Sequence, residues 1–213
     1  MSFITKLFTK KNNITIPIIS ITLFIITIIL NSIQYIANDR RYLQNNIGSD
    51  PLLYIYDFIG INGFMNNGLL FIFYFILTYV CLALVELNIG IIRILFLLCI
   101  GIIFHHLWDI CQDFICGLRH NSYNVNNSGY CCGSCLLFMA LGSLLFIAQH
   151  NTNNIFYRMI LLIIILGVVV GCVVYDESNN YYGLTKYQAV CRMLTWHTAF
   201  FLFGICCGFV LGK

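Results

Sequence analysis

Long apolar runs alternate with short polar connectors along the whole chain. A transmembrane helix needs about 20 mostly apolar residues, because every backbone N–H and C=O must be satisfied within the helix. The connectors are rich in asparagine, which favours turns over helix interiors. Six runs are apolar enough, over residues 14–36, 69–87, 91–108, 130–149, 155–175 and 193–211. The pattern predicts an all-α, polytopic membrane protein with six transmembrane helices in a single domain, residues 1–213.

The composition agrees with a lipid environment. Hydrophobic residues make up 60% of the chain and charged residues 9%, and the mean hydropathy is +0.88. An ordinary soluble domain is about one quarter charged. The 11 Lys and Arg residues are scattered and form no basic face, so nucleic acid is not an expected partner. We expect a multi-pass integral membrane protein surrounded by lipid.

The distribution of positive charge predicts the orientation. An even number of spans puts both termini on one side of the membrane, and the side with more Lys and Arg is usually cytosolic. Lys6, Lys10 and Lys11 precede the first run. We therefore expect cytosolic termini, and we call the opposite side the outer face.

Two polar residues in the expected spans suggest chemistry. Ser134 lies about four residues into the fourth run, or roughly 6 Å deep at 1.5 Å per residue, and His197 lies at about the same depth in the sixth. A serine and a histidine at hydrogen-bond reach form the minimal nucleophile and base pair of acyl transfer. The structural alternative is that each bonds to a nearby backbone carbonyl. We interpret Ser20 and Ser143 in that structural way.

Both candidates belong to ridges that favour close helix packing. Such ridges arise where small residues recur at four-residue spacing, because they let another helix approach closely. Gly204, Gly208 and Gly212 form such a ridge, which begins two turns after His197. Ser134, Phe138 and Gly142 have the same spacing in the fourth run, so the close-packing face of that run includes the serine. We expect Ser134 and His197 to point into a helix interface.

These residues resemble landmarks of the rhomboid intramembrane serine proteases. The stretch Cys132–Gly142 is similar to the family's G-x-S-G sequence, apolar run and glycine. Trp196-His197 with its trailing glycines resembles the family's histidine helix. Glu86, Gly90 and Arg93, at the turn between the second and third runs, resemble the family's pattern of acid, glycine and basic residue. The three landmarks occur in the family's order and cover roughly residues 69–211.

The resemblance implies a six-transmembrane-helix rhomboid-like bundle that cleaves transmembrane protein substrates near their ends. Ser134 would be the nucleophile. His197 would be the general base and then the acid that protonates the leaving amine. The start of the fourth helix would offer backbone N–H groups to the oxyanion, with water entering from the outer face. Such an enzyme needs no cofactor and no metal.

A catalytically inactive rhomboid-like protein that binds transmembrane helices is an alternative. The family has a His and an Asn on its second span that assist the oxyanion, whereas this chain has Leu70 and Tyr74 at the corresponding positions. Cys132 and Cys135 stand where the family has glycines beside its serine. An inactive binder would keep the same fold and tolerate these departures.

A membrane thiol oxidoreductase is a lesser alternative. Cys132 and Cys135 form a C-x-x-C motif at a helix N-terminus, where the pKa of a thiol falls and redox exchange becomes easy. Cys111 and Cys116 on the preceding outer loop would then form a shuttle pair. This interpretation leaves His197 and the glycine ridges unexplained.

A metal site at the end of the third run is a further alternative. The polar residues there are His105, His106, Asp109 and Asp113. His105 and Asp109, and likewise Asp109 and Asp113, have the i, i+4 spacing that places side chains on one face of a helix. Such side chains are metal ligands. The structural alternative, which we favour, is an interfacial helix end whose polar residues face lipid headgroups.

Overall fold

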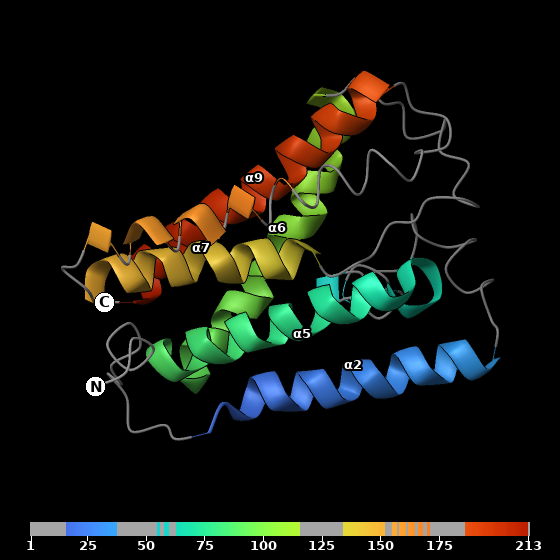
Figure 1. Ribbon diagram of the computed structural model, residues 1–213, viewed down its shortest axis with the longest axis horizontal. Helices are drawn as coiled ribbons and strands as arrows, with labels where there is room; N and C mark the ends of the chain where they lie inside the picture. The colour runs from blue at the N-terminus through green and yellow to red at the C-terminus, as the bar shows by residue number, and fades with distance from the viewer. Residues whose placement is uncertain are drawn as a thin grey trace.

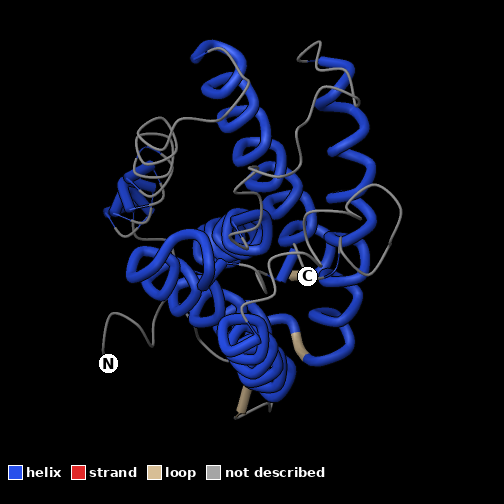
Figure 2. Tube along the Cα trace, turned by 90° about the vertical axis from the view of Figure 1, so that its right-hand side faces the viewer, coloured by secondary structure: helices blue, strands red, loops and turns tan. Residues whose placement is uncertain are grey.

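The structure is a bundle of α-helices. It is a computed structural model that describes residues 16–37, 55, 58–59, 63–115, 134–151, 155–156, 158–160, 162–164, 166–167, 170 and 186–212. Its helices are α2 (Ile18–Ala37), α5 (Gly63–Ile89), α6 (Ile91–Ile115), α7 (Ser134–Asn151) and α9 (Lys186–Leu211). No strand occurs among the described residues, as Figure 2 shows. The predicted all-α class is confirmed.

The helices overlap the expected spans but do not share all their ends. α6 continues past residue 108 to Ile115, and α9 begins at Lys186 instead of residue 193. An apolar run shows which part of a helix can contact lipid, but the helix itself can be longer. At the start of α9, the helix formers Lys, Gln, Ala and Arg continue the helix beyond the apolar run. The described residues between 155 and 170 are also helical. The expected starts at residues 14 and 130 lie outside the described residues.

Only part of the predicted membrane layout is supported by helix length. One helix in the described part of the chain is long and apolar enough to cross a membrane, the stretch Ile91–Trp108 of α6. Shorter apolar stretches lie in the other helices, at Ile18–Ile33, Phe75–Ile89, Ser134–Ile147 and His197–Leu211. A single such helix is weak evidence, so the six-span layout is not confirmed and stays a prediction.

The turn between α5 and α6 is made by Gly90. Its φ of 92° lies in the left-handed region, which glycine adopts without a Cβ penalty. The Gly90 N–H donates to the Glu86 carbonyl at 2.8 Å and ends α5. The Gly90 carbonyl accepts from the Ile94 N–H at 3.0 Å and starts α6. We call this end of the bundle the turn end.

Glu86 attaches the start of α2 to the turn end. Its carboxylate is fully buried and accepts hydrogen bonds from the backbone N–H groups of Ile19 (2.9 Å) and Ser20 (2.8 Å) and from the Ser20 hydroxyl (2.6 Å). The first N–H groups of a helix have no partner within the helix and carry partial positive charge. Glu86 therefore caps α2 from a different helix.

Arg93 attaches the end of α9 to the same turn. Its guanidinium donates to the Leu211 carbonyl at 2.5 Å, where the last carbonyls of a helix lack partners. The start of α2 and the end of α9 therefore lie together at the turn end, as Figure 1 shows. The residues of the acid, glycine and basic pattern thus each have a structural role in the turn or at a neighbouring helix end.

α7 and α9 run parallel and in backbone contact. A Cβ added to Gly142 would overlap the Phe201 carbonyl oxygen, and one added to Gly204 would overlap the Met139 carbonyl oxygen. Further along, Gly208 lies against Ser143. From Met139 to Ser143 on α7, the glycine partners advance from Gly204 to Gly208 on α9, so the two helices run in the same direction. Both helices therefore begin at the end opposite the turn end (Figure 1).

Candidate active site

Ser134 is the first residue of α7 and is partly exposed. The residues that follow it are buried, because α7 packs against both α5 and α9 and lies inside the bundle. Ser134 is therefore the accessible end of a core helix. The backbone N–H groups of its first turn have no partner within the helix and can act as donors.

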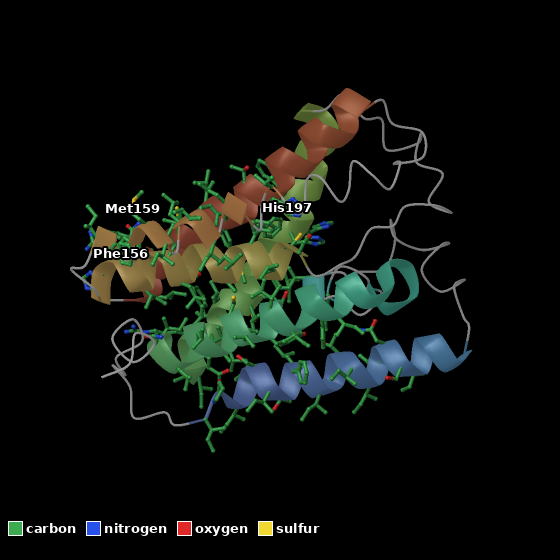
Figure 3. All side chains as sticks on the ribbon, viewed as in Figure 1. Phe156, Met159 and His197 are labelled. Carbon is green, nitrogen blue, oxygen red and sulfur yellow. The ribbon has the colours of Figure 1, made fainter. Side chains whose placement is uncertain are left out.

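His197 lies on α9, beside the start of α7, as Figure 3 shows. Its side chain is 2% exposed. The ring of Phe138 packs against the imidazole, with ring centroids 4.3 Å apart and an interplanar angle of 41°. Phe138 is one helical turn after Ser134 on the same face of α7. The imidazole thus occupies the α7–α9 interface on the face that carries Ser134.

The glycine contacts set the levels of Ser134 and His197. Ser134 precedes Met139 and Ser143 of α7 by five and nine positions, and His197 precedes their partners on α9, Gly204 and Gly208, by seven and eleven. The two residues are therefore offset by about two positions, or roughly 3 Å at 1.5 Å per residue. Ser134 and His197 thus lie within about one helical turn of each other along the interface.

The two serines interpreted as structural make structural hydrogen bonds. The Ser143 hydroxyl is buried and lies 3.0 Å from the Met139 carbonyl oxygen of its own helix and 2.9 Å from the Gly204 carbonyl oxygen of α9. It therefore bridges the close approach of the two helices. Ser20 bonds to Glu86, a partner that lies 66 residues away in the chain. Its sequence neighbourhood does not reveal that partner.

The thiol alternative is not favoured by the geometry. The side chain of Cys135 is only 6% exposed, whereas thiol exchange needs an accessible sulfur. Cys111 is free and exposed. Cys116 and Cys132 lie outside the described residues.

The metal alternative is also not favoured. His105 is buried and its neighbour His106 is exposed, so the two rings face different sides of α6. The side chains of Asp109 and Asp113 lie outside the described ones. Among the described side chains, no group of three or more His, Cys, Asp or Glu could hold a metal ion.

The side chains of Leu70 and Tyr74, the residues at the family's oxyanion positions, lie outside the described ones. Phe138 was expected only as a packing residue, yet its ring touches His197. Its position four residues after Ser134 was the available signal, but spacing alone does not reveal a partner on another helix.

Comparison of the chain with protein-family models, with curated proteins and with solved structures finds no match.

Proposed function

We propose that this protein is an intramembrane serine protease that cleaves transmembrane protein substrates with a Ser134–His197 dyad. The observation that carries the proposal is the contact between His197 and Phe138, one turn from Ser134 on the same face of α7. Together with the register of the two helices, it supports a hydroxyl and an imidazole within about one helical turn of each other along one interface. This is the arrangement that acyl transfer needs.

The chemistry follows from the two groups. His197 accepts the Ser134 proton while Oγ attacks the scissile carbonyl, and it then protonates the leaving amine. Backbone N–H groups at the start of α7 stabilise the oxyanion. A water molecule, deprotonated by His197, releases the acyl group and regenerates Ser134. Neither a metal nor a cofactor takes part.

The outward side chains support a six-span membrane bundle. Ile92 is 83% exposed, Phe156 64% and Met159 51%, and Figure 3 shows Phe156 and Met159 on the outside of the bundle. Apolar exposure over several helices is unfavourable in water and favourable in lipid. Membrane lipid is therefore the proposed surroundings, and a transmembrane helix is the proposed substrate.

An inactive protein that binds transmembrane helices is the second candidate. The observation that favours it is the burial of His197, whose ring packs against Phe138. A general base must reach the nucleophile and, later, water. An inactive binder would use the same outward apolar faces without chemistry at Ser134.

Cleavage in lipid bilayers tests the proposal. The purified protein is incubated with a panel of tagged single-span substrates and, separately, with a fluorophosphonate that labels activated serines. We expect cleavage and labelling by the wild type and a loss of at least about 10³-fold in Ser134→Ala and His197→Ala.

Matched variants control for the loss of a serine or a histidine elsewhere. Ser32 is exposed and donates a hydrogen bond to the Ile28 carbonyl. His150 is exposed in the last turn of α7, far from Ser134 along that helix. Ser32→Ala and His150→Ala should therefore keep full activity. Cleavage that survives Ser134→Ala would exclude the dyad. A wild type that neither cleaves nor labels, beside an active rhomboid control, would favour the inactive binder.

A further inference from the structure

A short segment between α2 and α5 reaches into the bundle. Phe58 is fully buried and Ile59 is 8% exposed, although neither belongs to one of the long helices. The segment lies in the connector between the first two apolar runs, residues 14–36 and 69–87. Its burial indicates that it contributes to the packing of the bundle.

Hydrogen bonds fix the backbone of this segment. The Tyr79 hydroxyl on α5 donates to the Ile59 carbonyl at 3.3 Å. The same hydroxyl oxygen lies 2.7 Å from the Thr27 hydroxyl of α2, which then acts as the donor because Tyr79 has a single hydroxyl proton. Ile59 is thereby attached to both α2 and α5.

The ring of Phe58 fills a space between α6 and α9. Its centroid lies 6.0 Å from that of His105 on α6 and 6.5 Å from that of Phe200 on α9. The space exists because α6 has a glycine there, since a Cβ on Gly101 would come within 2.7 Å of Phe58 Cζ. Phe58 therefore acts as a wedge that touches both helices.

Phe200 connects the wedge to the candidate site. It is fully buried, three residues after His197, on the adjoining turn of α9. His105 packs against it at 5.8 Å, and Phe104 meets it edge-on at 5.1 Å. The position of Phe200 among these rings limits how α9 can rotate or slide near His197, because packed interiors have little free volume.

We propose that Phe58 is a positioning residue for the dyad: through Phe200 it holds the middle of α9, and so the His197 imidazole, in place against Ser134. This inference rests on the proposed protease function. Removing the ring would leave a cavity beside Phe200, into which α9 can relax. A displacement of about 1 Å between reacting groups can lower a rate by the order of 10²-fold.

The test compares Phe58→Ala and Phe58→Leu with a control of similar burial. Leu82→Ala is suitable, because Leu82 is fully buried on α5 one turn before Glu86, near the turn end. Each variant is studied in lipid for its unfolding temperature, its kcat and KM for a cleaved substrate, and its rate of fluorophosphonate labelling at Ser134.

We expect both alanine variants to lower the unfolding temperature by similar amounts. Only Phe58→Ala should slow serine labelling and lower kcat, by about tenfold to a hundredfold with KM unchanged. Phe58→Leu, which refills most of the space, should recover most of the rate. Equal labelling rates in Phe58→Ala and Leu82→Ala would overturn this inference but not the proposed function. The same holds for a low labelling rate in Phe58→Leu at a wild-type unfolding temperature. A wild type that is not labelled would overturn the proposed function and this inference with it.

Discussion

At the scale of single residues, Glu86 combines a buried charge with a structural task. Burying a carboxylate is costly unless hydrogen bonds replace its water. Here two backbone N–H groups and the Ser20 hydroxyl do so, at 2.6 to 2.9 Å. The sequence marked Glu86 as part of a pattern, but its partners lie 66 and 67 residues away. Only the fold identifies them.

Replacing Glu86 tests this cap. In Glu86→Gln, an amide N–H₂ replaces one carboxylate oxygen and cannot accept the hydrogen bonds that this oxygen accepted. We therefore expect the free energy of unfolding to fall by about 1 to 3 kcal/mol. Reversible unfolding in detergent micelles measures it. Ser20→Ala removes one of the three hydrogen bonds and should lower the free energy of unfolding by less. The double variant should lower it by less than the sum of the two single losses. Full additivity of the two losses would contradict the shared cap.

At the scale of elements, the pair of α7 and α9 depends on the absence of side chains. Gly142 and Gly204 each lie against a backbone carbonyl of the other helix. Ser143 adds a hydrogen bond across the contact to the Gly204 carbonyl, at 2.9 Å. Close approach of this kind increases van der Waals contact and stabilises helix pairs where the hydrophobic effect is weak, as in lipid.

Adding one methyl group tests the close approach. Gly204→Ala places its Cβ on the Met139 carbonyl, a rigid backbone atom, so the helices must separate. We expect a loss of about 1 to 3 kcal/mol in the free energy of unfolding. The matched control is Gly167→Ala, because that glycine is helical and, beyond its own helix backbone, no atom of the described residues lies within 4 Å of the added Cβ. It should be neutral or stabilising by up to about 1 kcal/mol. Equal effects of the two substitutions would show that packing does not depend on Gly204.

At the scale of the whole molecule, the bundle has apolar residues both inside and outside. Exposed isoleucines line α2, and exposed large apolar side chains also lie on α6, on the described residues between 155 and 170, and on α9. The start of α2 and the end of α9 share the turn end, while Ser134 lies at the opposite end (Figure 1). This arrangement is the one expected for helices that alternate in direction across a bilayer.

Spin labels at single cysteines test the membrane placement. Cys99 on α6 and Cys206 on α9 are exposed on the bundle surface, within the expected spans. In lipid vesicles, labels there should collide with dissolved oxygen and be shielded from a water-soluble nickel chelate. A label at Cys111, beyond the apolar part of α6, should show greater nickel access. Strong nickel access at residue 99 would place α6 in water and remove the basis of the intramembrane proposal.

Much of the fold followed from local sequence, and much of the site did not. The apolar runs predicted where helices form, because apolar length and helix propensity are properties of neighbouring residues. The expected span begins at residue 193, whereas α9 begins at Lys186, because polar helix formers continue the helix beyond the apolar run. The spacing of Ser134 and His197 predicted a shared level. The Phe138 ring against His197 and the Phe58 wedge were not predicted, because both contacts join segments far apart in the chain.

By itself, the sequence determined an all-helical chain, the approximate helix positions, the glycine ridges and the two candidate groups, because these depend on residue type and spacing along one segment. The tertiary structure decided which helix faces meet, which buried polar groups find partners and which connector enters the core. Those outcomes depend on competition among many apolar surfaces of similar chemistry. Packing shape and hydrogen-bond geometry, rather than composition, select one of them.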